Sequence, residues 1–211
     1  MSDALPGEAV DAVVIGGGAA GLNGALMLAR SRRSVVVIDS GSPRNAPAEA
    51  VHGLIVLDGT PPAEILRQGR EQVRRYGGRV VCGEVTAAEP AAPSADGDLR
   101  FTTTLADGRS VTARRVLVAT GLHDVLPEVP GLAGHWGHGV VHCPYCHGWE
   151  VRDEPIGILA AGPASIGQAF LFRQLTDDLT YFTQGIDLDE DPRPLRRPQH
   201  PHRRHPGAGG R

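Results

Sequence analysis

Three glycines at the spacing Gly16-x-Gly18-x-x-Gly21 constrain the fold of this chain more than any other feature. They directly follow a short apolar run, residues 10–15, and open a segment, residues 19–32, whose apolar side chains recur at helical spacing. A second apolar run, residues 34–38, ends in Asp39. In such a strand–helix–strand unit the glycines admit a pyrophosphate, and the terminal acid accepts hydrogen bonds from ribose hydroxyls. The pattern predicts a βαβ unit that binds a dinucleotide, with a glycine turn used only for packing as the alternative.

Charge and hydropathy exclude several classes of protein. A net charge of −3 and a pI near 6.3 give no general attraction to nucleic acid or to a membrane surface. The first 16 residues carry acidic side chains where a secretory signal carries basic ones. The most apolar stretch, residues 10–28, is interrupted by glycines and is not the continuous run of roughly 20 residues that a membrane span needs. We therefore expect a cytoplasmic protein without nucleic-acid or membrane partners, whose cysteines stay mostly reduced.

The segment after Asp39 continues the same domain. A polar loop leads to a helix over residues 61–76 with Tyr76 on its inner side, and then to a strand that ends in a buried Cys82. Residues 89–98 are predicted to form a surface loop. Strands over residues 99–105 and 110–115 form a hairpin around Asp107-Gly108, and a further strand, residues 116–120, runs into Gly121. The sequence thus predicts a βαβ unit, an antiparallel meander and a closing strand in one domain, residues 1–122.

Two of the three cysteines, Cys143 and Cys146, form a C-x-x-C pair flanked by His142 and His147. This spacing permits a disulfide, and the pKa of one thiol in such motifs is commonly lowered to about 7 or below. His147 is the predicted general acid–base, with His142 and His138 as further candidates. Three other interpretations of the pair remain: attachment of a c-type haem through C-x-x-C-H, a zinc site with nearby histidines, and a purely structural disulfide. Redox chemistry is the preferred interpretation, and no metal is predicted.

A second glycine pattern follows the cysteine pair. Residues 155–161 are predicted to form a buried strand, and Gly162-x-Ala164-x-x-Gly167 leads into a helix over residues 168–175 and a strand over residues 179–182. The methyl group of Ala164 narrows the approach of a pyrophosphate. The pattern predicts a second βαβ unit for a nicotinamide nucleotide, with close helix packing as the alternative explanation of its glycines.

The order of these motifs resembles the FAD domain of flavoproteins with two dinucleotide-binding domains, and among them the low-molecular-weight thioredoxin reductases. In that family an A-T-G stretch, here Ala119 to Gly121, closes the first FAD segment before the chain crosses into an NADPH domain that carries C-x-x-C. The resemblance implies an α/β fold of two Rossmann-like FAD/NAD(P)-binding domains with an antiparallel meander. The second domain, residues 123–184, is expected to be incomplete. It also implies FAD, less firmly NADP(H), a homodimer, and a thioredoxin-like protein or a small-molecule disulfide or dithiol as partner.

The same resemblance assigns roles to individual residues. Cys146 would face the flavin and Cys143 would meet the substrate. The predicted cofactor-binding residues come from the two glycine patterns, the strand ends and the neighbouring loops: Gly16, Gly18, Ala19, Ala20, Gly21, Asp39, Ser40, Arg44, Asn45, Val85, Ala119, Thr120 and Gly121 for FAD, and Gly162 and Gly167 for the nicotinamide nucleotide.

Two departures from the family leave the reaction open. His147 stands where the family has an acid, and Thr183-Gln184-Gly185 replaces the arginine-rich segment that holds the 2′-phosphate of NADPH. The sequence C-x-x-C-H-G also resembles dithiol oxidases of natural-product pathways, which close disulfides in small molecules. The prediction is therefore a disulfide reductase of the thioredoxin reductase type. A dithiol oxidase that uses oxygen and an inactive flavin-binding fragment are the alternatives.

The last residues, 185–211, differ in composition from the rest of the chain. They are rich in arginine, proline and histidine and poor in large apolar residues, so they cannot bury enough surface to offset their ordering entropy. We expect a disordered tail or the product of a frameshift. A basic nucleic-acid-binding tail is the alternative, although no aromatic residues interleave it.

Overall fold

The computed structural model describes residues 4–92 and 97–185, so the predictions for the tail lie outside the described residues. The chain divides into two compact units, Met1–Val140 (unit 1) and Val141–Arg211 (unit 2). The functional division after residue 122, which was drawn from motifs, stays a prediction.

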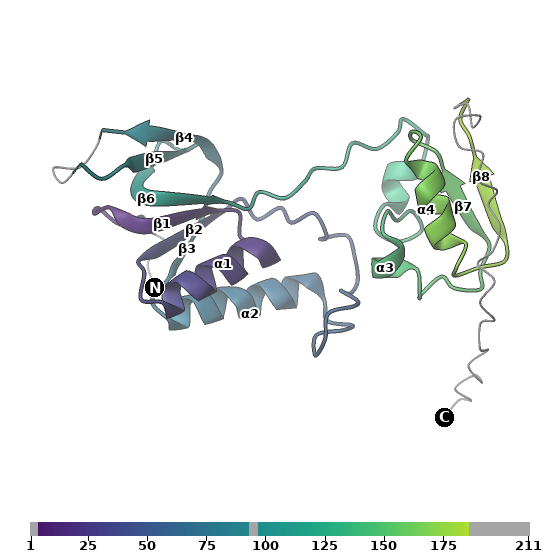
Figure 1. Ribbon diagram of the computed structural model, residues 1–211, viewed down its shortest axis with the longest axis horizontal. Coiled ribbons are helices and arrows are strands. Elements are labelled where there is room, and N and C mark those ends of the chain that lie inside the picture. The colour runs from purple at the N-terminus through teal and green to yellow at the C-terminus, as the bar shows by residue number, and fades with distance from the viewer. Residues whose placement is uncertain (1–3, 93–96, 186–211) are drawn as a thin grey trace. The chain divides into compact units, whose positions relative to one another are not determined.

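Unit 1 is built on a six-stranded sheet with the order β3-β2-β1-β6-β5-β4 (Figure 1). The strands β1, β2, β3 and β6 are parallel, while β6, β5 and β4 form an antiparallel meander. The bounds of the strands are β1 Val10–Ile15, β2 Val35–Asp39, β3 Arg79–Cys82, β4 Val85–Ala91, β5 Arg100–Leu105 and β6 Ser110–Val118. The fold class is therefore confirmed as α/β with a Rossmann-like sheet.

Two layers of apolar side chains hold this sheet. The helices α1 (Ala19–Arg30) and α2 (Pro62–Arg75) lie side by side against one face, where Leu22 and Val73 are buried with alternate residues of β1, β2 and β3 (Figure 1). Leu105 and Val111 of the meander are buried against the other face. Both faces of β2 are thus covered, which explains its unbroken run of buried residues, since alternation is expected only where one face meets water.

The structure corrects four details of the sequence-based prediction. β6 is one continuous strand rather than two, because Ser110 to Ala113 pair with β5 while Ala113 to Val118 pair with β1. β4 extends to Ala91, into the predicted loop, because β5 provides its partner. Tyr76 is 43% exposed, and its hydroxyl accepts a hydrogen bond from Arg30. Cys82, predicted to be buried, is an exposed free thiol at the end of β3.

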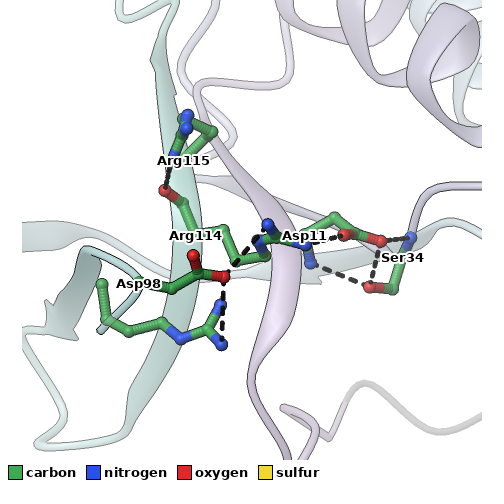
Figure 2. A network of polar contacts seen from close by, with 6 residues as sticks. Asp11, Ser34, Asp98, Arg114 and Arg115 are labelled. Atoms are coloured by element: carbon green, nitrogen blue, oxygen red, sulfur yellow. Dashed lines mark hydrogen bonds and ion pairs between the residues drawn. The ribbon is translucent and has the colours of Figure 1, made fainter. Parts of the chain in front are cut away.

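A polar network lies at the start of β1, the end of this strand that is farther from the glycine turn (Figure 2). The Asp11 carboxylate accepts hydrogen bonds from the backbone N–H and the hydroxyl of Ser34 at 2.9 and 3.0 Å. Arg114 on β6 lies 3.1 Å from the carboxylate of Asp98 and 3.9 Å from that of Asp11. The network joins β1, the start of β2 and β6.

Unit 2 contains a smaller βαβ arrangement. β7 (Ile156–Leu159) and β8 (Leu179–Phe182) are parallel, and α4 (Ser165–Phe172) connects them. The buried core consists of Ile158, Ala169 and Phe172. Just before this unit, Val140 forms an isolated bridge with Trp136. No helix in the described part of the chain has the length and apolar content needed to span a bilayer.

Candidate functional site

The glycine turn of unit 1 lies at the carboxyl edge of the parallel strands, where open α/β sheets bind ligands. Gly16 has φ +104°, and a side chain there would collide with the backbone carbonyl of Ala119. A side chain at Gly21 would in turn collide with the carbonyl of Gly16. The end of β6 is held in register by a 2.8 Å hydrogen bond from the N–H of Ala119 to the carbonyl of Ile15. The tertiary structure thus brings the first glycine pattern and the A-T-G stretch, Ala119 to Gly121, together.

The start of α1 has the properties of an anion site. Gly18 is its N-cap residue, and no side chain of the described residues caps the helix. A Cβ at Gly18 would meet none of the described atoms within 4 Å, so the described part of the chain leaves the approach to the turn open. Ala19 and Ala20, in the first turn of the helix, are exposed. Uncapped N–H groups at a helix N-terminus favour a phosphate, so these residues fit a dinucleotide.

Asp39, the acid predicted to hold a ribose, already has two partners. Its Oδ1 accepts a 3.1 Å hydrogen bond from the N–H of Gly17. Its Oδ2 accepts a 2.8 Å hydrogen bond from the Arg70 guanidinium on α2, with 16% of the Asp39 side chain and 31% of the Arg70 side chain exposed. Sequence reasoning missed Arg70, because a single arginine on a charged helix gives no signal of its long-range partner. Ser40, next to Asp39, is exposed.

Arg44 is committed to a salt bridge rather than free for a ligand. Its Nε and Nη2 each donate to the Asp124 carboxylate at 2.7 Å. This hydrogen bonding raises the pKa of the Arg44 guanidinium above its ordinary value. A Cβ at Gly137 would lie 2.6 Å from Pro47. The loop after β2, which contains Arg44 and Pro47, is therefore close to the segment after Gly121 at a second point. The loop after β2 is therefore fastened to the segment that follows Gly121.

Two other residues that are predicted to contact FAD make contacts within the protein. The backbone carbonyl of Asn45 accepts a 3.1 Å hydrogen bond from the N–H of Ala48. Val85 begins β4 and packs against the same buried cluster as Ile15. Contact of Arg44, Asn45 and Val85 with a flavin stays a prediction.

Cys143 and Cys146 form a disulfide in unit 2, with their Cα atoms 5.3 Å apart, within the usual range for such bonds. The short helix α3 (Pro144–His147) follows Cys143 and carries Cys146, so that one helical turn brings the two sulfurs together. Cys146 is exposed and Cys143 is half-buried. The predicted pairing is thus present, and we call residues 142–148 the redox turn.

The two histidines beside the cysteines have different surroundings. Both ring nitrogens of His147 are buried, and among the described residues they have no hydrogen-bond partner. His142 is exposed, and its backbone carbonyl accepts a hydrogen bond from the side-chain amide of Gln168 on α4. The sequence did not indicate a role for Gln168, because the helical periodicity of α4 allows a polar residue at this position but does not show what it contacts. A catalytic role for His147 stays a prediction.

The second glycine pattern is open. A Cβ at Gly162 or at Gly167 would meet nothing within 4 Å among residues 4–92 and 97–185, so packing within the described chain does not require glycine at either position. The Ser165 hydroxyl accepts the N–H of Ala161 at 3.0 Å and closes the turn before α4. At the end of β8, Gln184 donates its amide to the carbonyl of Ala160 at 3.0 Å. Within residues 4–92 and 97–185, no group of three or more His, Cys, Asp or Glu side chains could hold a metal ion.

Comparison with known proteins agrees with this arrangement. A family model described as pyridine nucleotide-disulphide oxidoreductase matches residues 10–192. The chain is 41% identical over 155 residues to the thioredoxin reductase tcpT of Claviceps purpurea, an alignment that covers 73% of this chain and 47% of that protein. Its structure is similar to that of HlmI, with a TM-score of 0.82, 46% identity and coverage of 88% of this chain and 57% of that one. An oxidoreductase from Agrobacterium tumefaciens gives a TM-score of 0.78 at 38% identity, covering 87% of this chain and 61% of that one. The chain therefore spans about half the length of the relatives it matches.

Proposed function

The chain belongs to the pyridine nucleotide-disulphide oxidoreductase family, and from this premise we propose that it carries the flavin site and the redox disulfide of a thioredoxin reductase-like enzyme. Electrons would pass between NADPH, FAD and the Cys143–Cys146 pair to a protein or small-molecule disulfide. The observation that carries the proposal is the disulfide itself, which lies in the same unit as a second, open βαβ turn. Residues 1–122 would supply the first FAD segment and residues 123–184 the partial nucleotide domain of a cytoplasmic, homodimeric enzyme.

The residues around the first glycine turn would hold FAD. The uncapped N–H groups at the start of α1 would bind its pyrophosphate, and Asp39 would accept hydrogen bonds from ribose hydroxyls. Ala119 and Thr120 would border the flavin end, because they lie against the same turn. When bound, FAD supplies the two-electron exchange with the cysteine pair.

The cysteines carry the exchange with substrate. In the reduced pair, the Cys143 thiolate attacks one sulfur of the substrate disulfide, forming a mixed disulfide and releasing one substrate thiolate, which takes up a proton. The Cys146 thiolate then attacks Cys143 Sγ, which re-forms the Cys143–Cys146 bond and releases the second substrate thiolate. Cys146 is the more exposed of the two cysteines, so trapping each cysteine separately tests the order of attack.

A second candidate is supported by the end of β8. The described residues that follow it, Thr183 to Gly185, carry no basic side chain, and the Gln184 amide is engaged by Ala160. No 2′-phosphate partner for NADPH is therefore present in this segment. In the alternative, a small-molecule dithiol gives two electrons and two protons to the Cys143–Cys146 disulfide and leaves as a cyclic disulfide, with oxygen as the final acceptor. An inactive fragment is the third candidate.

Anaerobic visible spectroscopy separates the three. The purified chain is loaded with FAD, and the visible absorption of the flavin is followed after addition of NADPH or of a small dithiol. Bleaching by NADPH supports the reductase, and bleaching by the dithiol alone supports the oxidase. The double variant Cys143→Ser/Cys146→Ser serves as control, since it abolishes bleaching by the dithiol and leaves flavin binding intact. A chain that takes up no flavin would contradict both enzymes.

A further inference from the structure

One contact in unit 2 joins α4 to the redox turn, and neither proposed reaction uses it. Gln168, half-buried on α4, donates its Nε2–H to the backbone carbonyl of His142. The same nitrogen lies 3.5 Å from Nδ1 of the His142 ring. His142 immediately precedes Cys143, so the amide holds the chain at the entry to the redox turn.

The chemistry of the partner fixes the orientation of this amide. A carbonyl oxygen only accepts hydrogen bonds, so the NH₂ group of Gln168, and not its oxygen, faces His142. The NH₂ group has two hydrogens, and the second is available to the ring nitrogen. Gln168 thus contacts both the backbone and the imidazole of the residue before the reactive cysteine.

Apolar packing holds the rest of the turn against the same helix and its continuation. Val141, at the entry, packs against the buried cluster of Ile158, Ala169 and Phe172. At the exit, a Cβ on Gly148 would collide with Leu175, and the carbonyl of Leu175 accepts a 2.9 Å hydrogen bond from Asp153. Among the described residues, Gln168 adds a polar contact to this packing, and the contact reaches His142, the residue next to Cys143.

We propose that Gln168 is a positioning residue that stabilises the redox turn in the conformation that closes the Cys143–Cys146 disulfide. The inference rests on the proposed function for its use, because in that function the pair must open and close in every turnover. The contact is present in the disulfide form. Its removal therefore destabilises that form and makes the disulfide easier to reduce.

The test measures the equilibrium between the full-length chain and dithiothreitol, which requires no flavin or nicotinamide. The fraction of reduced protein is read by alkylation and mass spectrometry. Cys82, the free thiol, adds one adduct in every state, so the oxidised and reduced chains differ as one against three adducts. Gln168→Met keeps the length of the side chain and removes both donors. Gln168→Glu keeps the shape and places an acceptor against the carbonyl of His142.

A matched control exists in the same unit. Gln184 also donates a side-chain amide to a backbone carbonyl, that of Ala160, away from the redox turn. For Gln168→Met we expect the equilibrium constant for reduction to rise about three- to ten-fold, the effect of one net hydrogen bond. For this two-electron couple a ten-fold change equals about 30 mV. Gln168→Glu should shift it at least as far, whereas Gln184→Met should leave it at the wild-type value.

Each result decides between the proposals. A wild-type equilibrium constant in Gln168→Met and Gln168→Glu, with unchanged circular dichroism, overturns the role of Gln168. A lower melting temperature without a shift in the equilibrium does the same, because it shows a contact that stabilises both redox forms alike. If one variant does not fold, the other decides. A wild-type disulfide that dithiothreitol cannot reduce would instead overturn the proposed redox function.

Discussion

At the scale of single residues, two glycines of one turn do different work. Gly16 is required by the fold, since its φ is +104° and its Cα faces the carbonyl of Ala119. Gly18 lies in open space at the start of α1, so its lack of a side chain serves the approach of a ligand. Substitutions at the two positions should therefore separate stability from binding.

We expect Gly16→Ala to lower the free energy of unfolding of unit 1 by roughly 2 kcal/mol or more, from backbone strain and steric overlap. Gly18→Ala should leave that free energy within about 0.5 kcal/mol, as a substitution in open space does. Gly18→Ala should nevertheless weaken FAD binding about ten-fold, because its methyl group stands where the pyrophosphate approaches. Urea denaturation and flavin fluorescence titration measure the two effects. Equal stability of the two variants would contradict this division.

The ion pair between Asp39 and Arg70 predicts an effect of Arg70 on the affinity for FAD. Because Arg70 occupies Oδ2 of Asp39, it competes with a ribose hydroxyl for the same acceptor. Arg70→Gln should tighten FAD binding about two- to five-fold, less than the full value of a hydrogen bond to a charged group. Arg67→Gln is the control on the same helix, since Arg67 pairs with Glu64 and Glu71 instead. Weaker binding of FAD by Arg70→Gln would mean that Arg70 itself contacts the dinucleotide.

The roles of the two cysteines are separable by trapping. If Cys143 attacks the substrate, Cys146→Ser leaves a mixed disulfide that no second thiol resolves, and Cys143→Ser leaves Cys146 unreactive in this step. Incubation of each variant with an aromatic disulfide, followed by mass spectrometry in a Cys82→Ser background, detects the adduct. A stable adduct on Cys146 alone, in keeping with its greater exposure, would reverse the assignment.

At the scale of elements, β6 explains how unit 1 closes. One half of this strand belongs to the meander and the other half to the parallel sheet, so a single element joins both parts. The polar network of Figure 2 fastens its middle to the start of β1 through Arg114, Asp98 and Asp11. Hydrogen bonds from Ser34 to Asp11 join β1 to β2 in the same place.

This network predicts a pH dependence of stability. Hydrogen bonds from the backbone and the hydroxyl of Ser34 lower the pKa of Asp11 below its ordinary value of 3.8. The stabilisation is therefore fully present above that value and is lost as the pH falls through the lower pKa of the folded state. Asp11→Asn should cost about 1 kcal/mol at pH 7, given the partial exposure of the group. In urea denaturation, the difference from wild type should shrink as the pH falls below 3.8. A difference in the free energy of unfolding that does not change with pH would contradict this role of the Asp11 carboxylate.

At the scale of the whole molecule, the two units have unequal cores. Among the described residues, the two clusters of unit 1 contain nine and eight buried residues, whereas the cluster of unit 2 contains three. Buried apolar area supplies most of the stability of a domain, so unit 2 should be the weaker one.

The two tryptophans report on the units separately, since Trp136 belongs to unit 1 and Trp149 to unit 2. Trp149→Phe leaves a probe of unit 1, and Trp136→Phe leaves a probe of unit 2. We expect the fluorescence transition of unit 2 to occur at lower urea concentration, with the two transitions not coinciding. Coincident transitions in both variants would show that the chain unfolds as one cooperative body.

Much of the architecture could be predicted from the sequence because its signals are local. Glycine spacing, runs of buried β-branched residues and helical periodicity depend on neighbours along the chain, and they placed β1, α1, β2 and β8 within a few residues. The spacing of Cys143 and Cys146 likewise permitted the disulfide that the structure contains. The errors came where a long-range partner decides the outcome. They include the continuity of β6, the length of β4 and the exposure of Cys82.

By itself, then, the sequence determined the α/β class, the turn that fits a dinucleotide and the pairing of Cys143 with Cys146. Only the tertiary structure decided which side chains meet across distant segments: Arg70 with Asp39, Arg44 with Asp124, and Gln168 with His142. Only it decided that the ring nitrogens of His147 are buried while His142 is exposed. The physical reason is that local geometry fixes the backbone of a turn or helix. Side-chain pairing depends on the register and packing of elements that are far apart in the chain.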